Sequence, residues 1–195
     1  MEIRVTIDGS RAQVETISIL EDLWHDFEFF KSNALRLDQS DAPTSERLLA
    51  KRYQRAALLT LIFYLEGVVN HWLKELLADA EWKAVERKWC LELKIDKIQE
   101  RLAAASEGAP EITEAKKIRN ALVHLKPGSD LELYDKINVD LLEATERRIV
   151  TWLQATERAL GIPRHPDTEA DSKDLRDALG TTEPSTEGYS GRSKA

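Results

Sequence analysis

The sequence predicts an all-α protein: an antiparallel bundle of four to five helices, with a minor N-terminal strand or hairpin and a disordered C-terminal tail. Apolar residues recur at steps of three and four through most of the chain, which is the helical period. The composition, with 42% hydrophobic and 32% charged residues, is typical of a globular domain. Several amphipathic helices without a sustained strand pattern favour a helical bundle.

Three parts are expected along the 195 residues: a strand or hairpin at 1–17, the helical bundle at 18–161 and a tail at 162–195. Apolar and polar residues alternate from Ile3 to Ile7, as in a strand. The tail is rich in Asp, Glu, Ser, Thr and Gly and has few large apolar residues. Burial there cannot offset the entropy that ordering costs, so we expect disorder.

The first predicted helix spans 18–37, and the second spans 44–78. The second carries an unbroken apolar stripe, formed by Leu58, Ile62, Leu65, Val69, Trp72 and Leu76. A neighbouring row places Glu66 and Asn70 among apolar residues. A buried carboxylate there would need a partner.

A third helix is expected over 82–102, and a fourth is expected to start near Pro110, because proline suits the first turn of a helix. Asp140, followed three residues later by Glu143, resembles a capping box for a fifth helix. Gly161 can supply the left-handed residue that ends this helix.

Charge and composition exclude several classes of function. The formal net charge of −7 does not provide the strongly basic surface of a non-specific nucleic-acid binder, so any RNA contact must be local. The single cysteine, Cys90, excludes an intrachain disulfide framework and a thiolate zinc cluster, and it fits a reducing compartment. We expect no metal and no cofactor.

No membrane segment is expected either. The first residues lack the basic start and long apolar run of a secretory signal. The longest apolar stretch, 56–69, is broken by Thr60 and Glu66 and is too short to span a bilayer. The predicted location is therefore the cytoplasm.

Cationic, amide and imidazole side chains cluster on the predicted fourth helix. Asn120 and His124 are four residues apart and lie on one side of it, and the stem of Arg119 is long enough to reach the same cleft. These three side chains can address one phosphate. Nearby lysines add positive charge, namely Lys116, Lys117 and Lys126.

Residues 119–124 resemble the motif of ribonucleases in the HEPN superfamily, in which four to six residues separate an Arg from a His and a polar residue follows the Arg. The layout is also similar, because a long helix carrying Glu66 and Asn70 precedes the motif helix. The resemblance covers roughly 48–160. It implies metal-independent cleavage of RNA, in which the ribose 2′-hydroxyl attacks the neighbouring phosphorus. With this resemblance Arg119, Asn120 and His124 are the predicted catalytic residues, and the nearby lysines are expected to bind RNA, namely Lys116, Lys117 and Lys126.

In such a reaction a group with a pKa near neutrality moves the proton, and the resemblance assigns this role to His124. Arg119 would stabilise charge on the phosphate oxygens. The resemblance also implies a homodimer through the motif helix, because a twofold contact brings two Arg and two His into one cleft. Members of this kind serve in toxin–antitoxin and phage-defence systems, so an antitoxin or another protein is a candidate partner.

One position departs from the family pattern. In toxins that pair with a nucleotidyltransferase antitoxin, a Tyr often follows the His by two residues, but Lys126 stands there in this chain. Regulation by modification of that Tyr therefore does not carry over.

Other interpretations stay open. Arg119 can be a structural ion-pair partner of Glu66, with Asn120 and His124 satisfying backbone groups at a helix end. A non-catalytic HEPN-like module would use the same helix to dimerise or to bind a nucleotide or a protein. A bundle that only scaffolds other helices needs no ligand. In the catalytic interpretation, Glu66 and Asn70 orient Arg119.

Overall fold

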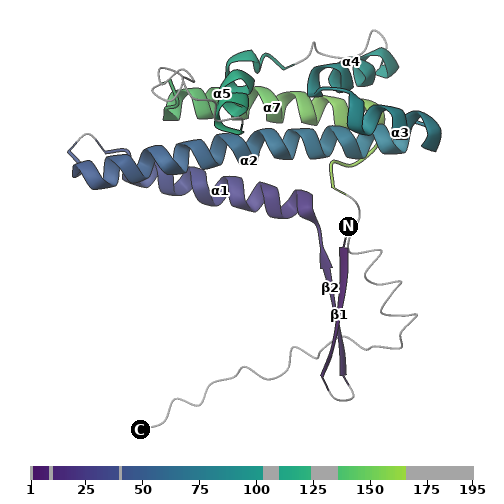
Figure 1. Ribbon diagram of the computed structural model, residues 1–195, viewed down its shortest axis with the longest axis horizontal. Helices are drawn as coiled ribbons and strands as arrows, with labels where there is room; N and C mark the ends of the chain where they lie inside the picture. The colour runs from purple at the N-terminus through teal and green to yellow at the C-terminus, as the bar shows by residue number, and fades with distance from the viewer. Residues whose placement is uncertain (1, 9–10, 40, 103–109, 124–135, 166–195) are drawn as a thin grey trace. The chain divides into compact units, whose positions relative to one another are not determined.

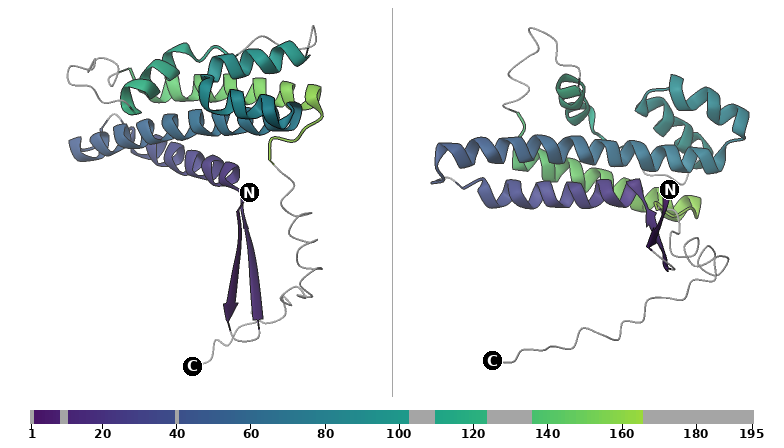
Figure 2. Two further views of the ribbon diagram at one scale, coloured as in Figure 1. Left: turned by 45° about the vertical axis from the view of Figure 1, so that its right-hand side comes forward. Right: turned by 60° about the horizontal axis from the view of Figure 1, so that its bottom comes forward.

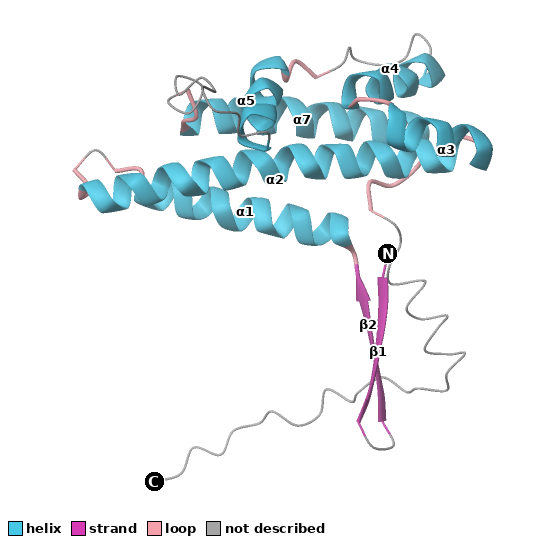
Figure 3. Cartoon of the chain, viewed as in Figure 1, coloured by secondary structure: helices cyan, strands magenta, loops and turns pink. Residues whose placement is uncertain are grey.

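The chain is mostly helical. The computed structural model describes residues 2–8, 11–39, 41–102, 110–123 and 136–165. Its elements are coloured by type in Figure 3 and have these bounds: β1 (Glu2–Asp8), β2 (Arg11–Ile17), α1 (Ile19–Leu37), α2 (Thr44–Leu76), α3 (Asp79–Lys88), α4 (Leu91–Leu102), α5 (Thr113–Val123) and α7 (Val139–Leu160).

The chain divides into two compact units. The described part of the first is a hairpin, in which β1 pairs antiparallel with β2 from Glu2 opposite Ile17 to Asp8 opposite Arg11. The second unit runs from Ile19 to His165 and contains all the described helices.

The long helix α2 is the centre of the helical unit and contacts each of its other described helices. α1 lies alongside α2, and α7 runs along another side of it (Figures 1 and 2). α5 is short and runs across α2 rather than along it (Figure 2). Arg119 and Asn120, which α5 carries, therefore lie beside the central helix α2.

The predicted apolar stripe of α2 forms the core. Five of its six members are buried, namely Leu58, Ile62, Leu65, Val69 and Trp72. The neighbouring row is less buried, because Glu66 and Asn70 are only partly covered and Phe63 is 37% exposed. This part of the row lies at the edge of the core, where polar side chains can keep contact with water, whereas Leu73 further along the row is fully buried.

The predicted third helix is interrupted. α3 ends at Lys88, Trp89 adopts an extended backbone with φ −96° and ψ 136°, and α4 begins at Leu91. The break allows both Val85 of α3 and Leu91 of α4 to be buried, which one straight helix at that spacing would not ensure.

One end of α7 differs from the prediction made from the sequence, and the other end agrees with it. Asn138, rather than Asp140, caps the N-terminus, because its side chain accepts a 2.8 Å hydrogen bond from the Leu141 backbone N–H. At the other end Gly161 has φ 67°, so the predicted left-handed stop is confirmed.

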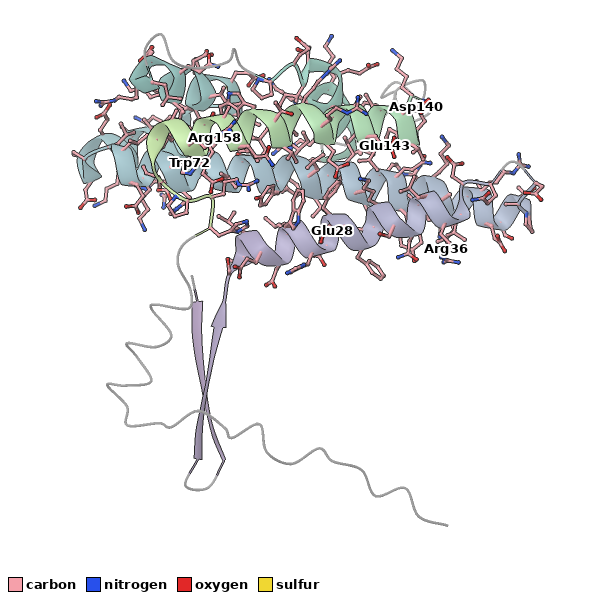
Figure 4. All side chains as sticks on the ribbon, turned by 180° about the vertical axis from the view of Figure 1, so that it is seen from behind. Glu28, Arg36, Trp72, Asp140, Glu143 and Arg158 are labelled. Atoms are coloured by element: carbon pink, nitrogen blue, oxygen red, sulfur yellow. The ribbon has the colours of Figure 1, made fainter. Side chains whose placement is uncertain are left out.

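The first four residues of the predicted tail belong to the helical unit. Ile162 packs against the core, and the Pro163 carbonyl accepts a 3.2 Å hydrogen bond from the Trp72 indole. Figure 4 shows Trp72 beside the chain that follows α7. The prediction of a tail from 162 onward was based on the average composition of the whole segment, which does not reveal so short a contact. The rest of the predicted tail, 166–195, lies outside the described residues.

α2 is also long and apolar enough, by length and composition alone, to cross a membrane. Its 33 residues continue without a break through Thr60 and Glu66, so the apolar window is longer than the stretch 56–69 noted in the sequence. However, 61% of that window is buried inside the fold. This burial is consistent with the core helix of a soluble protein.

Truncating the core of α2 should destabilise the unit. Leu65 is fully buried, so Leu65→Ala should lower the free energy of unfolding by about 2–5 kcal/mol through lost contacts and a residual cavity. Leu48 on the same helix is 61% exposed, and Leu48→Ala should change it by less than about 0.5 kcal/mol. Denaturant unfolding followed by circular dichroism measures both. Equal effects would contradict the assigned core.

Candidate functional site

The side chain of Arg119 reaches from α5 to α2. Its Nη2 donates to Glu66 Oε2 at 3.0 Å, which forms an ion pair, and its Nη1 donates to Asn120 Oδ1 at 3.0 Å. The guanidinium carbon lies 5.3 Å from the centre of the Phe63 ring. Three different contacts thus hold the guanidinium in place.

The packing of α5 explains this placement. Ala115 and Ile118, three residues apart, are buried and fix the inner face of the helix. Arg119 and Asn120 follow Ile118 and are half-buried, at the edge of the contact. On α2, Phe63 and Glu66 are also three residues apart and share one face.

The guanidinium keeps unused hydrogen-bonding capacity. Arginine carries five N–H donors, and the contacts above use one on each terminal nitrogen of Arg119. Its Nε is buried and has no partner among the described residues. Each terminal nitrogen keeps one N–H that no described residue engages, and two such donors suit the paired geometry of a phosphate.

The predicted RNA-binding lysines differ in their surroundings. Lys116 is half-buried and forms an ion pair with Glu92 of α4, which neutralises its charge. Lys117 is exposed. Lys126 and the predicted catalytic His124 lie outside the described residues. His124 is the residue that directly follows Val123, where α5 ends.

Asn70 has a partner other than Arg119. Its side-chain oxygen accepts a 2.8 Å hydrogen bond from Lys94 Nζ, which also donates to the Glu86 carbonyl at 3.2 Å. Lys94 is only 2% exposed, so these oxygens compensate a buried ammonium group. The structure thus brings Glu66, but not Asn70, to Arg119, and Asn70 holds α4 on α2.

Lys94 is a structural residue that the sequence could have identified. It follows Leu91 by three residues and precedes Ile98 by four, and all three are buried on one face of α4. A lysine at such a position requires oxygen acceptors nearby, and a polar residue on the facing helix is the natural source.

A second polar cluster lies where the chain after α7 crosses α2. The Tyr64 hydroxyl and His165 Nε2 are 3.2 Å apart, and their rings are 5.8 Å apart. Arg164 donates through Nε to Glu157 Oε2 at 2.8 Å. Burial raises the pKa of Tyr64, so its hydroxyl stays protonated and can donate to the imidazole.

Two histidines in this cluster favour the neutral form. Burial lowers the pKa of His71 and of His165, although Glu75 and Glu21 respectively act in the opposite direction. Arg164 also opposes a charge on His165. His71 Nε2 and His165 Nδ1 are buried without a hydrogen-bond partner among the described residues. Protonating either would place a poorly compensated charge there.

Within the described ranges, no group of three or more His, Cys, Asp or Glu side chains could hold a metal ion. No family model matches the chain, and neither a curated protein nor a solved structure matches it.

The histidine cluster should make stability depend on pH. Because the folded chain disfavours protonated His71 and His165, the unfolded chain binds more protons below about pH 6.5, and the free energy of unfolding should fall as pH drops from there. A chain carrying both His71→Gln and His165→Gln should lose less stability than the parent between about pH 6.5 and 5. Unfolding in urea at several pH values measures this. Identical pH profiles would contradict the assigned cause.

Proposed function

We propose that this chain is a HEPN-like endoribonuclease that cuts RNA without a metal ion. The observation that supports the proposal most is the partly exposed guanidinium of Arg119. Glu66, Asn120 and Phe63 hold it in place, and no described residue engages two of its terminal N–H groups. Arg119 lies on α5, and His124 is the next residue in the sequence after this helix ends.

In the proposed reaction, the ribose 2′-hydroxyl gives its proton to an imidazole and its oxygen bonds to the adjacent phosphorus. The bond from phosphorus to the 5′-oxygen breaks, and that oxygen takes a proton from a second imidazole. The products are a 2′,3′-cyclic phosphate and a 5′-hydroxyl. His124 is the proton-transfer group, since an unperturbed imidazole titrates near pH 6.5. Arg119 stabilises the charge on the phosphate oxygens.

This chemistry needs two proton-transfer groups, whereas one chain supplies one motif. We therefore include a twofold homodimer of HEPN-like bundles in the proposal, with the motif helices facing each other. Val123, at the end of α5, is 45% exposed, which suits a helix end that meets a partner. A cytoplasmic role in a toxin–antitoxin or phage-defence system fits an RNA-cutting activity under control of another protein.

A second candidate function is a non-catalytic HEPN-like module that binds a nucleotide or a protein. Both terminal nitrogens of Arg119 are already engaged, one by the opposite charge of Glu66. An arginine neutralised in this way can serve the fold alone, which favours this alternative.

Substitutions in the motif should separate these functions. His124→Ala and Arg119→Ala should each reduce the rate of RNA cleavage by about 100-fold or more, because a proton-transfer group or a charge-stabilising donor is lost. Arg158→Ala, a change at an exposed arginine of α7 labelled in Figure 4, should leave the rate unchanged. The measurement is cleavage of labelled RNA with a chelator present.

The oligomeric state of each variant is measured beside its activity by light scattering. Loss of cleavage by His124→Ala with the dimer intact supports the nuclease, whereas loss of assembly alone supports the interaction module. A parent protein that leaves both structured and single-stranded RNA uncut would refute the nuclease.

A further inference from the structure

We propose that Phe63 and Arg119 together form a nucleotide subsite, in which an unpaired RNA base stacks on the Phe63 ring while Arg119 binds the adjoining phosphate. The inference rests on the proposed ribonuclease function and specifies its substrate as single-stranded RNA.

The first observation is the exposure of an aromatic ring beside a cation. Phe63 is 37% exposed, although its neighbours Ile62 and Leu65 on α2 are buried. A single exposed apolar residue is ordinary on a protein surface. Phe63 differs because the Arg119 guanidinium lies over one face of its ring at 5.3 Å, so a base would stack on the opposite face, with an anion-binding group beside it.

The second observation concerns the free hydrogen-bonding capacity of this pair. Glu66 and Asn120 each occupy one N–H of Arg119 and fix the guanidinium beside the ring. The remaining N–H of each terminal nitrogen can bind two oxygens of one phosphate. The guanidinium is thus ordered before RNA arrives, which reduces the entropy lost on binding.

These two groups match the two parts of a nucleotide. An aromatic side chain stacks on the face of any base, and a guanidinium binds the phosphate that joins it to the next nucleotide. A base inside a duplex is already stacked on both faces, so it cannot reach a ring on a helix surface. The subsite should therefore prefer single strands, with little preference among the four bases.

The alternative occupant of the Phe63 surface is a second copy of the chain. The proposed dimer also involves α5, and an aromatic residue at its edge could be covered by the partner. That alternative predicts a weaker dimer in Phe63 variants rather than a weaker RNA complex. It is one outcome of the experiment below.

The experiment measures binding of a short 2′-O-methyl oligonucleotide, which lacks the attacking hydroxyl and cannot be cut. Phe63→Ala should weaken binding of the single strand by about fivefold to 150-fold, the range typical of losing one stacked base. Phe63→Trp should retain the parent affinity. Leu49→Ala, a change at another exposed apolar residue of α2, is the matched control and should have no effect.

An abasic oligonucleotide of the same length separates stacking from an indirect effect on Arg119. If the ring stacks on a base, the parent and Phe63→Ala should bind the abasic strand equally. If the ring only positions Arg119, the difference between them should persist, and the stacking proposal is overturned.

Two further outcomes are distinguishable. If the parent binds and cuts RNA but Phe63→Ala binds the normal oligonucleotide as well as the parent does, the subsite fails and the ribonuclease stands. If the parent neither binds nor cuts RNA, both proposals fail. If Phe63→Ala weakens the dimer in light scattering but leaves the RNA affinity per site unchanged, the ring belongs to a protein interface. That result also overturns the subsite.

Discussion

The contact between Arg119 of α5 and Glu66 of α2 is the interaction on which the candidate site depends. α5 is short and crosses α2, so few buried residues fix its orientation, chiefly Ala115 and Ile118. The ion pair, at 3.0 Å, adds a polar contact beside that apolar one. Because both side chains are half-buried and keep some contact with water, the pair contributes only about 1 kcal/mol, so its main effect is on the position of the guanidinium rather than on stability.

The same ion pair places opposing demands on the site. The Glu66 carboxylate orders Arg119. It is also negatively charged, as a phosphate is, so the two compete for the same guanidinium. Phosphate binding is therefore favourable only through the donors that Glu66 and Asn120 leave free. The ring of Phe63 adds an attraction that does not depend on charge, which is useful in a chain with a net charge of −7. This balance of local contacts supports the proposed preference for a single-stranded substrate.

Strong periodicity made part of the fold predictable from the sequence. The apolar stripe of α2 and the left-handed stop at Gly161 follow from spacing and from glycine's backbone freedom. The break at Trp89 does not, because tertiary packing of α3 and α4 decides it. The ion pair of Glu66 with Arg119 was one of the interpretations that the sequence offered, but the choice of Lys94 by Asn70 depends on how helices distant in sequence pack.

Phosphate binding by Arg119 is the central proposal, and the side-chain resonances of Arg119 test it most directly. In protein with ¹⁵N-labelled arginine, the Nε–H signal of Arg119, assigned by its loss in Arg119→Lys, is followed during titration with a 2′-O-methyl single strand. We expect a shift that saturates with the affinity of the RNA. RNA that binds without moving this signal, or a strand that does not bind at all, would contradict the account.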